Sequence, residues 1–78
     1  GKVFLDYKTH LQELIQAQRD NRIRYEIVRE EGPDHSKIFH TQVLLNEEVV
    51  GAGQGRSKKE AEQEAARAAI ASLEISGL

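Results

Sequence analysis

The chain has no cysteine, methionine or tryptophan, and it has only one proline. Without cysteine it can form no disulfide framework and no thiolate site for a metal ion. No apolar run approaches the roughly 18 residues of a membrane-spanning helix, and the apolar stretch near the start is too short for a secretory signal. These absences leave a chain of 78 residues, 38% hydrophobic and 31% charged, which is the composition of one small soluble globular domain.

Residue 1 is a glycine and not an initiator methionine. This start is typical of a piece excised from a longer protein or of a tag scar, and we expect the former. We therefore expect residues 1–5 to be the remnant of a linker from an upstream domain, residues 6–75 to form the domain, and residues 76–78 to be a short tail.

Two segments have helical periodicity. Residues 3–18 place apolar side chains on one face at 100° per residue, namely Tyr7, Leu11, Leu14 and Ile15. Asp6 stands where a capping residue is expected. Near the other end, Ser57 and Glu60 have the spacing of a capping box, with Glu64 and Arg67 one turn apart on the outer face. An apolar stripe follows, consisting of Ala61, Ala65, Ala66, Ala69, Ile70 and Leu73, and its small side chains permit close packing.

The segment between the two helices predicts three strands. We expect strands at residues 25–31, 38–45 and 49–55, with a connection at 19–22, a loop at 32–37 and a hairpin turn at 46–48. Residues 38–45 alternate most cleanly, with Phe39, Thr41, Val43 and Leu45 on one face. Short loops imply an antiparallel sheet, and two amphipathic helices can cover one face of it. The predicted fold is therefore a two-layer α+β domain with the order helix, three strands, helix.

A search for catalytic groups finds no recognisable set. His10, His35 and His40 fall on a helix, a loop and a strand, with no patterned carboxylates beside them, and we interpret them as ordinary polar histidines. Glycines at 51, 53 and 55 are followed by Arg56 where a dinucleotide-binding loop needs another glycine, and no phosphate-binding P-loop pattern occurs. No serine lies in a nucleophile-elbow motif.

Three surfaces carry groups suited to binding. The first helix presents hydrogen-bonding side chains opposite its apolar face: Thr9, Gln12, Glu13 and Gln16. The loop at 32–37 carries His35 at its tip. The third surface is a cluster of cations, Arg56, Lys58 and Lys59, in a chain whose net charge is -2. Cations at a helix start oppose the macrodipole, but together with exposed N–H groups they suit a phosphate.

These residues resemble the double-stranded-RNA-binding domain family over residues 6–74. The order of the elements matches, as do the sequence GPDH in the first strand loop, Phe39 at the start of the second strand, and GQGRSKKEAEQEAA near the end. The resemblance implies three contacts with an RNA duplex, spanning about 16 base pairs and recognising shape more than sequence. The first helix would enter a minor groove, and the loop with Pro33, Asp34 and His35 would enter the next one. The phosphates between them would be bound by Arg56, Ser57, Lys58 and Lys59.

The segments DYKTHLQE and GRSKKEAEQEAA look most like the C-terminal domain of bacterial ribonuclease III. This likeness implies a cytoplasmic parent protein that cleaves double-stranded RNA, with Mg²⁺ in a nuclease domain that the chain lacks. The parent would be a homodimer through that missing part. The domain itself would bind double-stranded RNA as a monomer, without catalytic residues, cofactor, membrane contact or small-molecule ligand.

One position departs from the pattern of the family. Many members have a third cation one turn after the lysine pair, where this chain has Glu62. Since the salt dependence of binding scales with the number of neutralised phosphates, we expect Glu62 to weaken phosphate binding and to give a shallow salt slope. An alternative function remains open, because some domains of this fold serve as protein-interaction or dimerisation modules, and the acidic net charge fits that role.

Overall fold

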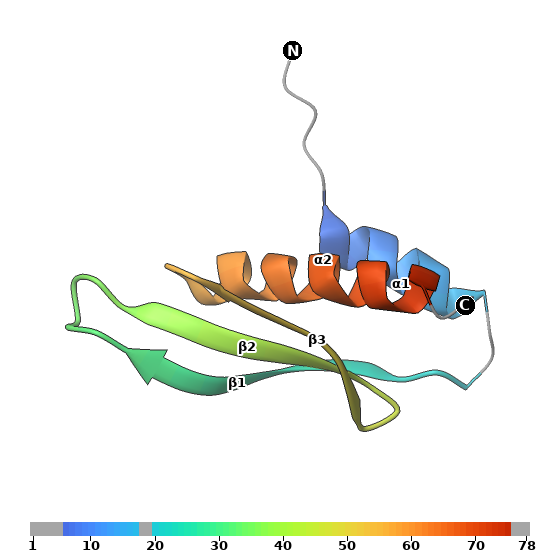
Figure 1. The fold of residues 1–78 in the computed structure, drawn as a ribbon, viewed down its shortest axis with the longest axis horizontal. Coiled ribbons are helices and arrows are strands. Elements are labelled where there is room, and N and C mark those ends of the chain that lie inside the picture. The colour runs from blue at the N-terminus through green and yellow to red at the C-terminus, as the bar shows by residue number, and fades with distance from the viewer. Residues whose placement is uncertain (1–5, 18–19, 76–78) are drawn as a thin grey trace, which may run out of the picture.

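The computed structural model describes residues 6–17 and 20–75 of the chain (Figure 1). Its elements are α1 (Tyr7–Gln16), β1 (Ile23–Glu31), β2 (Ile38–Leu45), β3 (Glu48–Gly55) and α2 (Lys58–Ile75). The expected linker remnant and the C-terminal tail lie outside the described residues. No helix in the described ranges is long and apolar enough to span a membrane.

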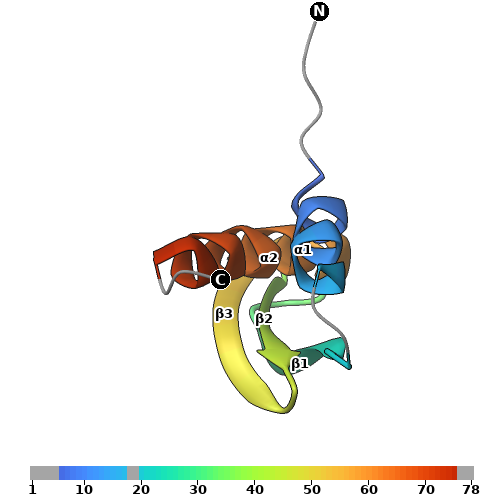
Figure 2. The same ribbon diagram turned by 90° about the vertical axis from the view of Figure 1, so that its right-hand side faces the viewer.

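The strands form one antiparallel sheet in the order β1-β2-β3. Both helices lie on the same face of this sheet, with α1 beside α2 (Figure 2). The predicted two-layer α+β architecture is therefore confirmed. The other face of the sheet is not covered by any element of the described chain.

A tight turn joins β2 to β3. Asn46 and Glu47 both have positive φ, 52° and 70°, as a type I′ hairpin turn requires of its two central residues. The Asn46 side chain also accepts a hydrogen bond from the Arg22 backbone N–H at 2.9 Å. Two strand starts differ from expectation: β1 begins at Ile23 instead of residue 25, because Ile23 already pairs with Leu45, and β3 begins at Glu48 instead of residue 49.

Buried and exposed side chains alternate imperfectly along β1, because its register with β2 shifts between Ile27 and Arg29. Before the shift, Ile23 and Tyr25 pack against the core, while Arg24 and Glu26 are exposed. The bulge leaves Val28 half exposed, at 48% of its surface. A residue inserted into one strand of a pair bends that strand locally, which accounts for the broken pattern in the sequence.

The core lies between the sheet and the two helices. Its fully buried large side chains include Leu11 and Ile15 from α1 and Val43 from β2. The predicted apolar stripe of α2 is buried along its whole length: Ala61, Ala65, Ala66, Ala69, Ile70 and Leu73. Such packing, with alanines on the helix side, brings the backbone of α2 close to the sheet.

Glycines on β3 make this close approach possible. A Cβ atom on Gly53 would meet the backbone of Ala65 and would lie 2.6 Å from the carbonyl carbon of Glu64. A Cβ on Gly51 would lie 2.6 Å from the backbone nitrogen of Ala69. The glycine-rich strand is therefore a packing surface for α2, which explains why it carries alternating glycines without forming a nucleotide loop.

Candidate nucleic-acid interface

The first candidate surface is the exposed side of α1. Asp6 caps the helix as predicted, since its carboxylate accepts a hydrogen bond from the Thr9 backbone N–H at 3.2 Å. Burial of Leu11 and Ile15 then turns the opposite side of the helix to solvent. The predicted binding residues all lie there and are exposed: Thr9, Gln12, Glu13 and Gln16. We call this surface the α1 face.

The second surface is the β1–β2 loop, residues 32–37. Gly32 has a φ of 95°, and a Cβ atom on it would lie 2.6 Å from the Ser36 carbonyl oxygen, so the turn requires glycine. The Ser36 N–H donates to the Pro33 carbonyl at 2.8 Å and closes the loop. Pro33, Asp34 and His35 are exposed at its tip. The loop therefore presents the predicted residues as a projection held by its own backbone.

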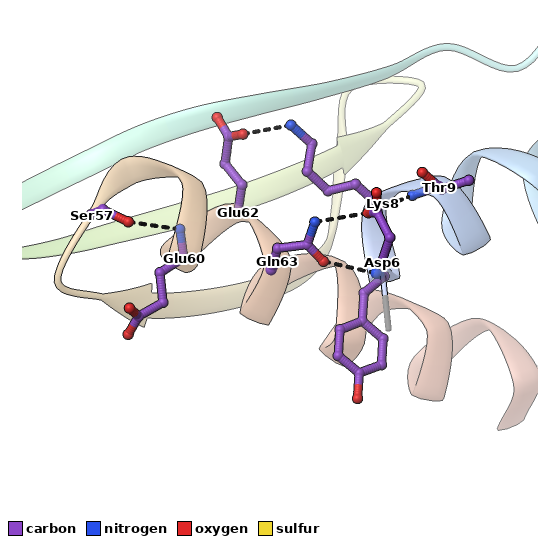
Figure 3. Close-up of polar contacts among 8 residues, drawn as sticks. Asp6, Lys8, Thr9, Ser57, Glu60, Glu62 and Gln63 are labelled. Carbon is purple, nitrogen blue, oxygen red and sulfur yellow. Dashed lines mark hydrogen bonds and ion pairs between the residues drawn. The ribbon is translucent and has the colours of Figure 1, made fainter. Parts of the chain in front are cut away.

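The third surface, which we call the α2 start, consists of Arg56, Ser57, Lys58 and Lys59, all exposed. The Ser57 hydroxyl accepts from the Glu60 N–H at 3.0 Å, which is one half of the predicted capping box (Figure 3). The other half is different, because the Glu60 carboxylate accepts from the N–H of Arg56 at 3.4 Å and not from that of Ser57. The helix start is thus capped as expected, with Glu60 reaching one residue further back.

Ion pairs neutralise most other cations of the domain. The structure describes nine of the eleven lysine and arginine residues, all except Lys2 and Arg19. Five of the nine lie between 2.6 and 3.7 Å from a carboxylate, namely Lys8, Arg24, Arg29, Lys37 and Arg67. No described carboxylate is within ion-pair range of the other four, and three of these belong to the α2 start. The free positive charge is therefore concentrated there.

The sheet brings the loop and the α2 start together. Phe39 pairs with Gly55, so the end of the loop and the residue before Arg56 meet at one end of the sheet. A small cavity between them is lined by Asp34, His35, Ser36, Lys37, Phe39 and Arg56. In Figure 1 the loop projects at the same end of the molecule at which α2 begins. These two predicted surfaces are thus neighbours in space.

The side chain of Glu62 has a partner that the sequence did not indicate. It forms an ion pair of 2.6 Å with the Lys8 ammonium of α1 (Figure 3). Lys8 neutralises part of the charge that we expect to weaken phosphate binding at the α2 start. Lys8 also lies 4.8 Å from the centre of the Tyr25 ring, a cation–π distance. Burial, with Glu62 and Asp6 nearby, raises the pKa of the Tyr25 phenol to about 12.

Gln63, the next residue of α2, holds the start of α1. Its amide oxygen accepts from the Tyr7 backbone N–H at 2.7 Å, and its amide nitrogen donates to the Asp6 carboxylate at 2.8 Å (Figure 3). The bond from Gln63, together with that from Thr9, lowers the pKa of the Asp6 carboxyl to about 2. We refer to Asp6, Tyr7, Lys8, Glu62 and Gln63 as the helix junction.

No local pattern in the sequence indicates this junction. The bonded residues are 54 to 57 positions apart in the chain, and neither a repeat nor a capping pattern links them. Two other ion pairs involve residues that the sequence analysis singled out. Glu64 and Arg67 are paired at 3.7 Å, as predicted, and His40 pairs with Glu31 at 2.6 Å.

Fold and sequence together define the family. The family model described as "Double-stranded RNA binding motif" matches residues 7–73, which is most of the chain. The chain therefore belongs to the double-stranded RNA binding motif family. The predicted resemblance is confirmed at this level.

Curated relatives bear the name Ribonuclease 3. The chain is 52% identical to the enzyme of Caldanaerobacter subterraneus subsp. tengcongensis over 75 residues, covering 96% of this chain and 33% of that protein. It is 54% identical to the enzyme of Streptococcus pneumoniae strain Hungary19A-6 over 69 residues, covering 88% of this chain and 30% of that protein. The chain thus spans about a third of the length of these relatives.

Solved structures of similar fold include two from the protein DRB4. The solution structure of both its dsRBDs with their linker matches with a TM-score of 0.68 and 28% identity, covering 96% of this chain and 48% of that one. The solution structure of its second dsRBD matches with a TM-score of 0.58 and 29% identity, covering 95% of this chain and all of that one. Both likenesses extend over nearly the whole domain.

Proposed function

We propose that the domain binds double-stranded RNA by its A-form shape. The observation that carries the proposal is the concentration of free cations at the α2 start, within a fold that belongs to this family. A phosphate backbone supplies most of the affinity in such complexes. The remaining two surfaces would then distinguish an RNA duplex from other polyanions.

The α1 face is suited to the minor groove. In A-form RNA this groove is wide and shallow and displays 2′-hydroxyls, whereas the major groove is too narrow for side chains. A 2′-hydroxyl both donates and accepts hydrogen bonds, and the amides of Gln12 and Gln16 do the same. Glu13 can accept from a hydroxyl, and Thr9 can do either. We assign all four residues to one minor-groove contact.

The β1–β2 loop would enter the next minor groove along the same side of the duplex. Its tip presents Pro33, Asp34 and His35 to solvent, and its backbone bond holds that tip in shape. Arg56, Ser57, Lys58 and Lys59 would contact the phosphates that border the intervening major groove. Members of this family bind in this way, across about 16 base pairs.

The test compares an RNA duplex of about 20 base pairs with a DNA duplex of identical sequence, a length that covers the expected site. We expect tighter binding to RNA, and equal affinity would remove the hydroxyl-recognition role of the α1 face. The double variant K58A/K59A should weaken binding to all duplex sequences alike. R67A, which removes a cation from the same helix at a paired position, is the matched control and should bind normally.

Salt dependence gives a second measure of the same contacts. A slope that requires six or more neutralised phosphates would contradict a clamp built on three cations. We expect a shallower slope in the wild-type domain, reduced further in K58A/K59A.

We also propose that the domain is the substrate-binding part of a longer endoribonuclease of the ribonuclease III type. The support is the identity to the Ribonuclease 3 proteins over a third of their length. Cleavage, the Mg²⁺ it needs and dimerisation would belong to the remainder of that protein, and the domain would position the duplex. An interaction-module role is less well supported, because the free cations of the α2 start suit a polyanion better than a protein surface. Sedimentation of the domain with and without duplex RNA separates the two functions.

A further inference from the structure

The helix junction connects the two surfaces that the proposed function assigns to different parts of the duplex. On α2 it begins at Glu62, one helical turn after Lys59 of the α2 start. On α1 it ends at Lys8, next to Thr9 of the α1 face. Two hydrogen bonds from Gln63 and the ion pair from Glu62 join the helices there. The junction is therefore placed to control how one surface is held relative to the other.

Apolar packing alone would hold α1 less specifically. Leu11 and Ile15 are buried against the core, but apolar contacts are non-directional and tolerate small rotations or shifts of a short helix. Hydrogen bonds prefer a narrow range of lengths and angles. The two bonds of Gln63 engage both a backbone N–H and the capping carboxylate of α1, so they define one orientation of that helix.

We propose that Gln63 is a positioning residue that makes the domain selective for A-form duplexes. This inference rests on the proposed function. Phosphates are common to RNA and DNA, so the α2 start alone has little basis for choosing between them. Selectivity requires the α1 face to meet a minor groove of A-form width while the α2 start is on the phosphates. Fixing the angle between the two helices enforces that match.

The chemistry of the junction explains why this residue is a glutamine. The side chain must accept a hydrogen bond from Tyr7 and donate one to a carboxylate, and an amide provides both groups. Glutamate would keep the first bond but lose the second, and it would place a second negative charge beside Asp6. The double variant D6N/Q63E restores a bond between the helices, with an amide at position 6 as donor to a carboxylate at position 63. It gives up the bond that the same Asp6 oxygen accepts from Thr9.

The experiment measures the ratio of RNA affinity to DNA affinity on duplexes of identical sequence. Gln63→Leu removes both hydrogen bonds without changing charge. We expect RNA affinity to fall about tenfold, because α1 would have to be ordered on the duplex without the two bonds of Gln63, with DNA affinity and the salt slope nearly unchanged. D6N/Q63E should restore the wild-type ratio. S72A, an exposed change further along α2, is the control.

The outcomes are distinct. A wild-type domain that does not prefer RNA would overturn the proposed function itself. A wild-type preference that Q63L retains, or an equal loss on RNA and DNA, would overturn the positioning role alone. If Q63L melts below the assay temperature, Q63E is measured in its place. Because Q63E loses only the bond to Asp6, its RNA-to-DNA affinity ratio must fall part of the way, and adding D6N must reverse that fall.

Discussion

The Lys8 ammonium lies 2.6 Å from the Glu62 carboxylate, joining the first turn of α1 to the second turn of α2. Both side chains are partly exposed, at 38% and 25%, so the pair contributes about 1 kcal/mol or less to stability. Its larger consequence is electrostatic. Glu62 is one turn from Lys58 and Lys59. It also pairs with Lys8, which would otherwise be an unpaired cation.

Replacing Glu62 by glutamine should therefore increase affinity for duplex RNA. The substitution removes an unfavourable charge beside the α2 start and releases Lys8, and we expect affinity to rise about two- to fivefold at low salt. Fluorescence titrations at several salt concentrations measure both affinity and slope. E64Q, whose carboxylate pairs with Arg67, should change neither, and an equal gain in E64Q would show a general charge effect.

The Asp6 carboxyl should make stability depend on pH in acid. Its pKa is about 2 in the folded domain against an ordinary value of 3.8, so the unfolded chain takes up a proton first as the pH falls. The stabilisation from this group is complete above about pH 5, declines progressively as the pH falls, and is absent below about pH 1. Urea midpoints measured across this range should fall less steeply for D6N, which keeps an oxygen to cap Thr9. Parallel curves would contradict the depressed pKa.

Gly53→Ala should destabilise the domain by about 1–3 kcal/mol, the usual cost of an added group in a packed site. The new methyl would press on the backbone of Ala65 and Glu64, which belong to a helix and cannot rotate away. Urea denaturation followed by circular dichroism measures the change. A52S, at an exposed neighbouring position on the same strand, should be nearly neutral. A neutral result for G53A would show that α2 can move off the strand.

Thr41→Val should leave stability unchanged or raise it by about 1 kcal/mol. Thr41 is 1% exposed, and its hydroxyl has no hydrogen-bond partner among the described residues. Valine has nearly the same shape and is well suited to a strand. The same urea measurement applies, with S72A as an exposed control. A clear loss of stability would mean that the hydroxyl is bonded in solution.

Periodicity and capping patterns were sufficient to predict the architecture. The apolar faces of both helices, the bounds of β2 and the caps at Asp6 and Ser57 follow from neighbours within four residues. The early start of β1 could not be predicted from nearby residues, because Ile23 joins the sheet through its pairing with Leu45, which is distant in sequence.

In the candidate site, too, some features follow from nearby residues and others depend on residues that are distant in sequence. Exposure of the α1 face and the α2 start is a local consequence of helix periodicity, and the sequence predicted it. The helix junction depends on side chains that meet only after the two helices have packed on the sheet. Gln63 is one of several polar residues in its segment, and nothing nearby in the sequence distinguishes it from the others.

The ion pairs that neutralise five of the nine described cations also bear on how the domain meets a duplex. Among the described residues, three of the four free cations are at one end of one helix, while the chain as a whole has a charge of -2. A polyanion therefore attracts that end and repels the remainder, which orients the domain before contact. Approaches in other orientations are disfavoured, so collisions should be converted to productive complexes more often than an evenly basic surface would allow.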